Sequence, residues 1–368
     1  NTPVTSSTVT LTINTAPVIG TQPLTQTVCE GSANVTFSVV ATGAGLSYQW
    51  KKNGVDIPLA TASSYVIATA ATADAGTYTV QVSGTCTPPV TSTGAVLTIN
   101  ELPEITVQPT SQTVCEGQGV TLTVNAGVTG NPTYQWRKGG VNIVGATGSS
   151  YTIATTVAAD AGNYDVVVSS SNAGCNTPVT SSTVTLTINT APVIGTQPLT
   201  QTVCEGSANV TFSVVATGAG LSYQWKKNGV DIPLATASSY VIATAATADA
   251  GTYTVQVSGT CTPPVTSTGA VLTINELPEI TVQPTSQTVC AGQSVTLSVN
   301  AGVTSNPTYQ WRKNSTNIPG ATSSSYTIAA TTVADADDYD VIVSSSNVGC
   351  NTAVTSNTVT ITINTAPV

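Results

Sequence analysis

The sequence predicts an all-β protein built from several tandem β-sandwiches. Short segments, such as residues 35–39, 47–50 and 78–82, alternate apolar with polar residues, as strands with one buried face do. Turn-forming pairs such as Asn53-Gly54 separate these segments at intervals of roughly ten residues, which is typical of an all-β sandwich. The 368 residues are three or four times the length of about 100 that one sandwich needs. Helical periodicity is absent.

An internal duplication dominates the sequence. Residues 1–115 recur without change as residues 176–290, at an offset of 175. Within this long unit lies a weaker repeat of about half the length, marked by four Tyr-Gln-Trp tripeptides and four Asp-Ala-x-x-Tyr segments. Such self-similarity is the signature of a repeat architecture, and here two domain types alternate.

The final segment of each unit, which alternates Thr with Val, Leu or Ile, sets the domain limits. We predict four domains, at residues 19–100, 101–189, 190–275 and 276–368. The joints between them are short and contain proline, so they are too stiff to act as flexible linkers. We therefore expect the domains to be stacked head to tail in a rather rigid array.

The first residues match the end of a domain whose body is absent. Residues 1–18 carry the sequence of a closing strand, and the chain ends on an equivalent strand. Two explanations are open: the sequence is a piece of a longer periodic protein, or residues 1–14 complete a sandwich in a neighbouring molecule by strand addition. We favour the first, because the four later domains carry their own closing strands.

Charge and composition exclude several classes of function. The formal net charge is −9, and all eight basic residues lie in four pairs directly after the Trp residues, at positions 51–52, 137–138, 226–227 and 312–313. Nucleic acids and anionic membranes bind clustered Lys and Arg, so neither is an expected partner. No apolar run approaches the roughly 18 residues of a membrane helix, so we expect no membrane span. Eight cysteines without a histidine or a CxxC motif predict disulfides, and hence an extracellular or cell-surface location.

The repeated motifs resemble those of the immunoglobulin superfamily, and in particular the tandem immunoglobulin-like domains of large repetitive secreted or cell-surface proteins of Bacteroidota. The resemblance covers the whole chain. It implies that the tryptophan of each Tyr-Gln-Trp motif is the core residue of strand C and that the tyrosine of each Asp-Ala-x-x-Tyr segment forms the tyrosine corner before strand F. These core markers are Trp50, Trp136, Trp225, Trp311, Tyr78, Tyr164, Tyr253 and Tyr339. The fourth unit has Asp337 where the others have glycine, so its turn could differ.

The cysteines depart from the antibody pattern. Where antibody-type domains carry the cysteines of strands B and F, this chain has Val39 and Val80. Its cysteines lie instead before strand B, as Cys29 does, and in the loop after strand F, as Cys86 does. In the immunoglobulin fold, strands B and F run in the same direction, so these positions lie at opposite ends of a sandwich, tens of ångströms apart at about 3.3 Å per residue. A disulfide requires Cα atoms within about 7 Å.

We therefore expect disulfides between neighbouring domains. The predicted pairs are Cys29–Cys175, Cys115–Cys261 and Cys204–Cys350, and Cys86 and Cys290 would then find partners beyond this segment or in adjacent subunits. The alternative is a bridge within each domain, such as Cys29–Cys86.

Catalytic chemistry has no support in the sequence. Without histidine, a nucleophile motif, a P-loop or paired carboxylates, we expect no enzyme, no catalytic residue and no cofactor. The acidic residues Asp335, Asp337, Asp338 and Asp340 could in principle hold Ca²⁺. We interpret them as a solvated turn and the tyrosine corner, so no metal site is predicted. The four Trp residues could be sugar-binding platforms, but their place in strand C favours the core.

The favoured function is structural: a stiff extracellular stalk or filament that associates with itself or continues as the same repetitive chain, because equal units stack with equal interfaces. One alternative is an adhesin whose loops, at residues 41–46 and 84–90, bind a surface glycan or a protein. The other is a spacer in a modular secreted enzyme.

Overall fold

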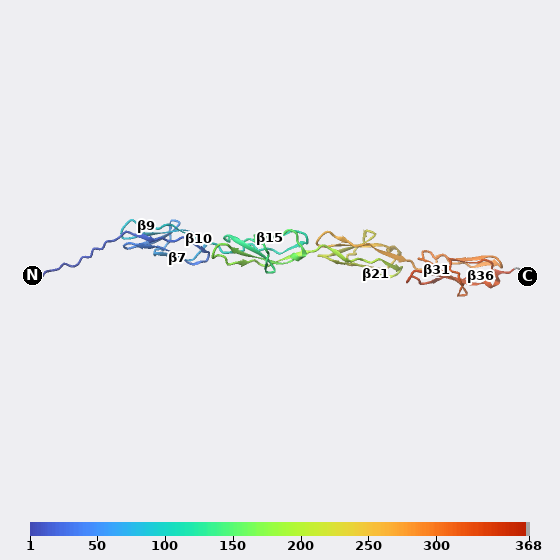
Figure 1. Cartoon of the computed structure of the whole chain (residues 1–368). Coiled ribbons are helices and arrows are strands. Elements are labelled where there is room, and N and C mark those ends of the chain that lie inside the picture. The colour runs from blue at the N-terminus through green and yellow to red at the C-terminus, as the bar shows by residue number, and fades with distance from the viewer. Residues whose placement is uncertain (366–368) are drawn as a thin grey trace. The chain divides into compact units, whose positions relative to one another are not determined.

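The computed structural model describes residues 1–365, which divide into two compact units, Asn1–Ile188 and the part from Asn189 on. Each unit contains two β-sandwiches, which we number 1 to 4 in chain order. Figure 1 labels some of their strands, and chain order follows the colour bar.

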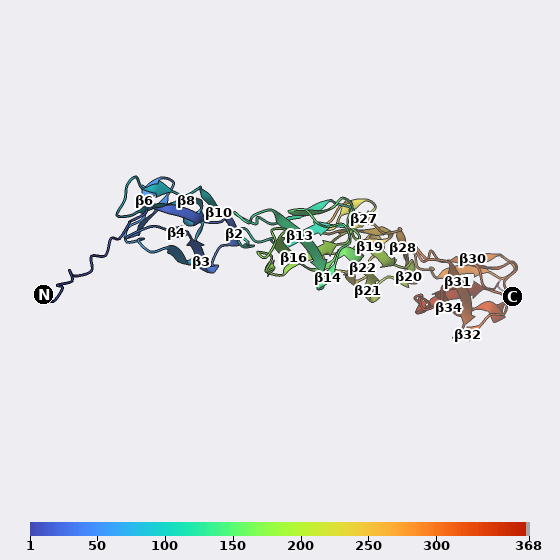
Figure 2. The same ribbon diagram turned by 60° about the vertical axis from the view of Figure 1, so that its left-hand side comes forward.

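Sandwich 1 has two layers. Its six-stranded sheet has the order β2-β10-β8-β5-β6, with β9 paired to β8, and the facing layer consists of the pairs β3–β7 and β1–β4. Figure 2 shows β8 and β10 in one layer and β3 and β4 in the other. The strands are β1 (Val18–Thr21), β2 (Gln26–Cys29), β3 (Ala33–Ser38), β4 (Val40–Thr42), β5 (Ser47–Lys52), β6 (Val55–Asp56), β7 (Ser64–Thr69), β8 (Gly76–Ser83), β9 (Val90–Thr91) and β10 (Ala95–Asn100).

Sandwich 2 has the same six-stranded sheet, in the order β11-β18-β16-β13-β14 with β17 on β16, and a facing pair β12–β15. In place of a β1–β4 pair, it has an isolated bridge between Val107 and Asn125. Its strands are β11 (Gln112–Cys115), β12 (Val120–Thr123), β13 (Pro132–Lys138), β14 (Val141–Asn142), β15 (Ser150–Ile153), β16 (Gly162–Ser170), β17 (Val179–Thr180) and β18 (Val184–Asn189).

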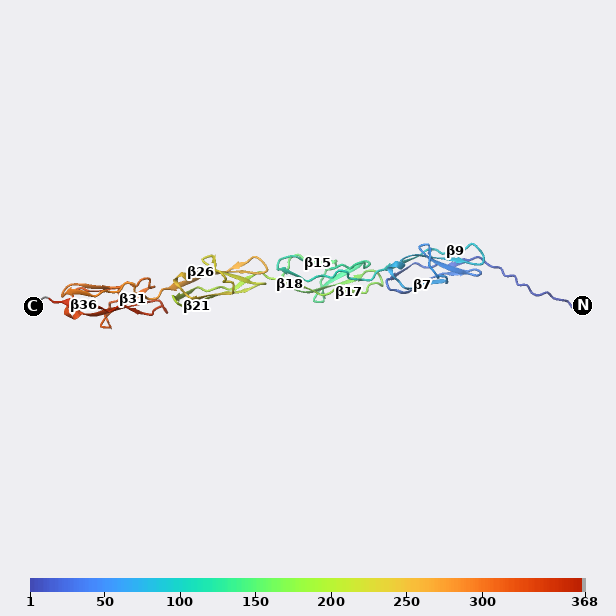
Figure 3. The ribbon, with the colours of Figure 1, turned by 180° about the vertical axis from the view of Figure 1, so that it is seen from behind.

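The second unit repeats these two patterns. Sandwich 3 contains β19 (Val193–Thr196), β20 (Gln201–Cys204), β21 (Ala208–Ser213), β22 (Val215–Thr217), β23 (Ser222–Lys227), β24 (Val230–Asp231), β25 (Ser239–Thr244), β26 (Gly251–Ser258), β27 (Val265–Thr266) and β28 (Ala270–Asn275). Sandwich 4 contains β29 (Gln287–Cys290), β30 (Val295–Ser298), β31 (Pro307–Lys313), β32 (Thr316–Asn317), β33 (Ser325–Ile328), β34 (Asp337–Ser345), β35 (Val354–Thr355) and β36 (Val359–Asn364). Figure 3 shows β31 and β36 of sandwich 4 from behind. The predicted all-β class and the tandem sandwiches are confirmed.

Each sandwich has its own apolar core between its two layers. In sandwich 1 the core includes Phe37, Val39, Trp50, Tyr78 and Val80, each at most 4% exposed. The period-two alternation explains this, because alternate residues of a strand point to the same face. The two valines that replace the antibody-type cysteines are both buried, so apolar packing holds the layers together where antibody domains use a disulfide.

One kind of element was missed by the sequence analysis. A single 3₁₀ turn precedes the strand of each tyrosine corner: η1 (Thr72–Asp74), η2 (Ala158–Asp160), η3 (Thr247–Asp249) and η4 (Val333–Asp335). The turn ends on the aspartate of the Asp-Ala-x-x-Tyr segment, and in η1 the Asp74 carboxylate accepts a hydrogen bond from the Ala71 backbone N–H at 2.9 Å. A three-residue turn is too short to produce helical periodicity.

Residues 1–17 form neither a helix nor a strand, and Val9 and Leu11 are 91% and 85% exposed. The identical sequence at residues 176–189 forms β17 and β18, where Val184 and Leu186 are 5% and 1% exposed. The same residues therefore form a strand only where a sandwich is present to receive it. The assignment of residues 1–18 to another sandwich, and the four domain limits, stay predictions.

Candidate functional site: the disulfide junctions within each unit

The cysteine before strand B ends a strand that pairs with the last strand of the same sandwich. β2 runs parallel to β10, and their register ends at Cys29 opposite Asn100. The next backbone N–H, of Glu30, donates to the Asn100 carbonyl at 2.9 Å. Asn100 is also the last residue before the joint to sandwich 2. Cys29 is thereby fixed at the end of sandwich 1 where the chain leaves it.

The cysteine after strand F lies on a hydrogen-bonded loop of the next sandwich. Cys175 follows β16, and its N–H donates to the Asn172 carbonyl at 3.2 Å. The Asn172 side chain accepts a hydrogen bond from the Asn131 amide at 2.8 Å. Cys175 is 1% exposed, so this loop presents a sulfur that is covered rather than free in solvent.

These two cysteines form a disulfide between neighbouring sandwiches. The Cα atoms of Cys29 and Cys175 are 5.4 Å apart, and those of Cys204 and Cys350 in the second unit are also 5.4 Å apart. Both distances lie within the usual disulfide range. Each bridge spans 146 residues of sequence and joins two separate cores. The two predicted bridges are confirmed, and the alternative bridge from Cys29 to Cys86 is wrong.

The remaining four cysteines fall into two states. Cys115 and Cys261 are disulfide-bonded. Cys86 and Cys290 are free thiols, the first half-buried and the second exposed.

The peptide joint between sandwiches 1 and 2 is held by the second sandwich. The Glu104 carboxylate accepts the Val128 N–H at 3.0 Å, and the Glu104 N–H donates to the Thr129 hydroxyl at 2.9 Å. A Cβ atom at Gly127, whose φ is +57°, would lie 2.0 Å from the Glu104 carboxylate, so only glycine allows this contact. The joint between sandwiches 3 and 4 contains the equivalent hydrogen bond, in which the Glu279 carboxylate accepts the Val303 N–H at 3.0 Å.

The loops that the adhesin hypothesis singled out contact each other. The Thr85 N–H donates to the Ala44 carbonyl at 2.8 Å, and the Ala44 N–H donates to the Thr15 carbonyl at 3.1 Å. Pro17 is buried beside Gly43 and Gly84. The loops at residues 41–46 and 84–90 therefore pack on the entering peptide of their own sandwich.

The core markers occupy equivalent places in all four sandwiches. The tryptophans are fully buried, and in sandwich 1 the Trp50 indole N–H donates to the Ala62 carbonyl at 3.0 Å. Each corner tyrosine hydroxyl donates to the carbonyl of the aspartate four residues earlier, at 2.7 to 3.0 Å. Burial is the main cause that raises the pKa of each corner tyrosine to about 12. The tryptophans and tyrosines that carry these bonds are Trp50, Trp136, Trp225, Trp311, Tyr78, Tyr164, Tyr253 and Tyr339.

Asp337 does not disturb the fourth corner. Ala336, which precedes it, has φ −70° and ψ 109°, whereas Ala75 at the same place in sandwich 1 has φ −57° and ψ 138°. This small backbone change keeps the Tyr339 hydroxyl 3.0 Å from the Asp335 carbonyl.

The acidic residues of this segment are each engaged by the protein. Asp340 makes a two-point ion pair with Arg312, at 2.7 Å for both bonds, and this hydrogen bonding raises the pKa of Arg312. Asp337 lies 3.6 Å from the Lys313 ammonium, and the Asp338 carboxylate accepts the Thr360 hydroxyl at 2.7 Å. Asp335 accepts the Thr332 N–H at 2.7 Å. The four carboxylates point to different partners instead of converging on one point.

A buried serine in each sandwich was missed by sequence reasoning. The Ser92 hydroxyl, 7% exposed, accepts the Val80 N–H at 3.0 Å and donates to the Thr93 carbonyl at 3.0 Å. The serine thereby accepts the backbone N–H of Val80, the residue that stands where antibody domains have the strand F cysteine. The available signal was that this serine recurs three residues before the closing strand of every repeat. The counterparts of Ser92 are Ser181, Ser267 and Ser356.

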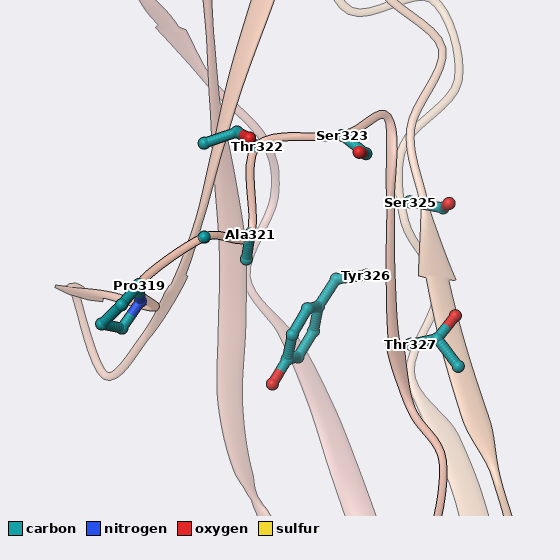
Figure 4. Close-up of a pocket in the computed structure, with 8 residues that line it drawn as sticks. Pro319, Ala321, Thr322, Ser323, Ser325, Tyr326 and Thr327 are labelled. Atoms are coloured by element: carbon teal, nitrogen blue, oxygen red, sulfur yellow. The ribbon is translucent and has the colours of Figure 1, made fainter.

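Three surface hollows are lined by uncharged residues. One, of about 240 Å³, lies between Pro319 and Thr327 in sandwich 4, and Figure 4 shows the Tyr326 ring beside Ala321 within it. That ring also stacks on the core ring of Tyr339, with centroids 6.2 Å apart. Sandwiches 1 and 3 each contain an equivalent hollow of about 360 Å³. In sandwich 1 it is lined by Thr, Gln and Ser residues and by Leu24.

Two further properties hold for residues 1–365. No helix there is both long enough and apolar enough to cross a membrane. Nor does that part of the chain contain a cluster of three or more His, Cys, Asp or Glu residues suited to a metal ion.

Comparisons with known proteins agree with the fold. The immunoglobulin domain family matches residues 103–170 and 278–345, within sandwiches 2 and 4. The I-band fragment I67–I69 of titin is similar over 71% of this chain and 99% of its own length, with a TM-score of 0.51 and 17% sequence identity. Immunoglobulin domains 1–4 of Sidekick-1 align with 95% of this chain and 99% of their own length, with a TM-score of 0.37 and 22% sequence identity. The decoration protein of Escherichia phage T5 is 48% identical over 62 residues, which are 17% of this chain and 38% of that protein. The chain is thus a tandem array of immunoglobulin-like sandwiches.

Proposed function

We propose that this chain is a structural, non-catalytic extracellular protein whose immunoglobulin-like sandwiches are fastened to their neighbours to form a stiff stalk or filament. The observation that carries the proposal is the Cys29–Cys175 bridge, repeated as Cys204–Cys350, because each of these two bridges links two separate cores. A disulfide that stabilised one sandwich would join its two layers. These bridges restrict the movement of one sandwich against the next.

We propose Cys115–Cys261, the third pair that the sequence predicts, as the remaining bridge of the series. Both residues are disulfide-bonded, and their separation of 261 − 115 = 146 residues equals that of the two bridges already described. This pairing would fasten sandwich 2 to sandwich 3 by the same geometry.

Two other observations support stiffness. The joints within each unit are bonded to the following sandwich through Glu104 and Glu279, so they do not act as free linkers. Disulfides persist in oxidising compartments, which supports an extracellular or cell-surface location. The origin in Bacteroidota and self-association into filaments belong to the same proposal, and they rest on the repeat motifs and on the duplication.

The proposal is tested by comparing the oxidised and reduced chain by small-angle X-ray scattering and electron microscopy. The cores contain valines where antibody domains have their disulfide, so the sandwiches stay folded on reduction while the distribution of interdomain angles broadens. The Cys86→Ser/Cys290→Ser variant is the matched control, because it keeps every described bridge. Equal angular distributions before and after reduction would contradict the proposal.

A second candidate, an adhesin for a surface glycan or protein, has one observation in its favour. The hollow beside Leu24 recurs beside Leu199 in sandwich 3, and hydroxyl and amide groups line both. A glycan array probed with the whole chain tests it, with Leu24→Ser/Leu199→Ser as the comparison. A spacer role in a modular secreted enzyme is the third candidate, and it would give the same scattering result without self-association.

A further inference from the structure

The two free thiols are duplicates of two bonded cysteines. Because residues 1–115 and 176–290 are identical, Cys86 corresponds to Cys261, since 86 + 175 = 261, and Cys290 corresponds to Cys115, since 115 + 175 = 290. Cys115 and Cys261 are disulfide-bonded, whereas Cys86 and Cys290 are free. Each of these two cysteine positions therefore occurs once in a disulfide and once as a free thiol, within identical sequence.

The surroundings of Cys86 are those of a bonded cysteine. Its sulfur lies 3.4 Å from the Asn14 carbonyl, and the sulfur of Cys261 lies 3.5 Å from the equivalent carbonyl of Asn189. The two residues differ in solvent exposure, since Cys261 is 3% exposed and Cys86 is half-buried. The loop therefore already holds the Cys86 sulfur in the place that a bridge requires.

Cys290 is likewise held in the frame of a bonded cysteine. β29 runs parallel to β36, and their register ends at Cys290 opposite Asn364. The bonded Cys29 and Cys204 stand at the same register position, opposite Asn100 and Asn275. Cys290 is exposed at this strand end, where a partner sulfur can reach it.

We propose that Cys290 of one copy of this chain forms a disulfide with Cys86 of a second copy, so that copies join end to end in the register of the internal repeat. The inference rests on the proposed structural function and specifies its self-association. Sandwich 4 has the sequence type of sandwich 2, and sandwich 1 has the type of sandwich 3. A junction between copies would therefore combine the type of strand end that carries Cys115 with the type of loop that carries Cys261.

The bond forms by thiol–disulfide exchange. One thiolate attacks a low-molecular-weight disulfide such as oxidised glutathione, which releases one reduced thiol and leaves a mixed disulfide on the protein. The second protein thiolate then attacks the mixed disulfide and releases the other reduced thiol. Two protein thiols are oxidised by two electrons, and the small disulfide is reduced by the same two.

The test uses the full chain as Cys86→Ser and Cys290→Ser variants in a glutathione redox buffer, analysed by non-reducing electrophoresis and peptide mapping. Each variant alone stays monomeric. An equal mixture forms a dimer that contains the Cys86–Cys290 peptide, and the unaltered chain forms a ladder. The proposal is overturned if either variant alone forms dimers as readily as the mixture, or if the mixture forms none.

The same peptide map separates this inference from the proposed function. If the mixture gives no dimer while Cys29–Cys175 and Cys204–Cys350 peptides are present, the end-to-end junction fails and the internal fastening stands. The Cys86→Ser/Cys290→Ser variant must stay monomeric throughout, and oligomers of it would also overturn the junction.

Discussion

Cys29 and Cys175 lie in different sandwiches, 146 residues apart in sequence, with their Cα atoms 5.4 Å apart. Cys86, which belongs to the same sandwich as Cys29, remains a free thiol. The covalent bond therefore serves the junction between sandwiches, and the interior of each sandwich depends on packing alone.

Replacing Cys175 by Ser should loosen sandwich 1 from sandwich 2 while leaving both folded. The bridge limits the freedom of the unfolded chain, so we expect the loss of about 2–4 kcal/mol of stability in this unit. Differential scanning calorimetry measures the loss. The second unit, with Cys204–Cys350 intact, is the internal reference, and an equal loss in both units would contradict the prediction.

Gly127→Ala should release the joint between sandwiches 1 and 2. The added Cβ would displace the Glu104 carboxylate, which then loses the Val128 N–H. Hydrogen exchange at residues 101–107 and 126–130 should become faster. Gly117→Ala is the matched control, because Gly117 also has a positive φ of +86° but has no atom within 4 Å of the added Cβ. Equal exchange in the two variants would refute the role of Glu104.

Tyr164→Phe should destabilise sandwich 2 without changing its fold. The substitution removes the hydrogen bond from the tyrosine hydroxyl to the Asp160 carbonyl at 2.7 Å and leaves the ring in place. We expect a loss of about 1 kcal/mol, read from the denaturation midpoint. Tyr134→Phe, on strand β13 and without a described hydroxyl partner, serves as the comparison and should change the midpoint less.

Asp340→Asn should destabilise sandwich 4 more than Asp338→Asn does. The amide keeps one acceptor oxygen, so Arg312 would lose one of its two hydrogen bonds and the negative charge of its partner, while its side chain is only 20% exposed. A loss of about 1–3 kcal/mol is expected, since a partly buried donor is left unsatisfied. Asp338 is exposed, and its carboxylate accepts one neutral hydrogen bond from the Thr360 hydroxyl, so its amide variant should stay near the parent stability. Chemical denaturation of both variants decides the order.

Stability should fall between about pH 10 and pH 12. The corner tyrosines have folded-state pKa values of about 12, against an ordinary value of 10.0 in the unfolded chain. Below pH 10 both states keep the proton, so these groups add no pH dependence. Above it the unfolded state releases protons first and is favoured. A denaturation midpoint that stays constant up to pH 12 would contradict this.

Much of this molecule was predictable because its repeats preserve local rules. The alternation at residues 35–39 and 78–82 placed Val39 and Val80 in a core, and the Asp74-to-Tyr78 spacing matched a real corner bond. The 3₁₀ turns and the buried Ser92 were missed, because three residues carry no period and a lone serine gives no apolar signal.

The sequence by itself determined the strands, the number of cores and the position of each thiol along the chain, since these follow from alternation and repetition. The strand directions of the resembled fold also predicted the pairs Cys29–Cys175 and Cys204–Cys350. Tertiary structure decided between these pairs and a bridge within one sandwich, because a disulfide depends on the distance between the two Cα atoms. It also decided that residues 9–14 stay exposed while the identical residues 184–189 form β18. A strand needs neighbours to accept its backbone hydrogen bonds and cover its apolar face, and the sandwich around β18 supplies them.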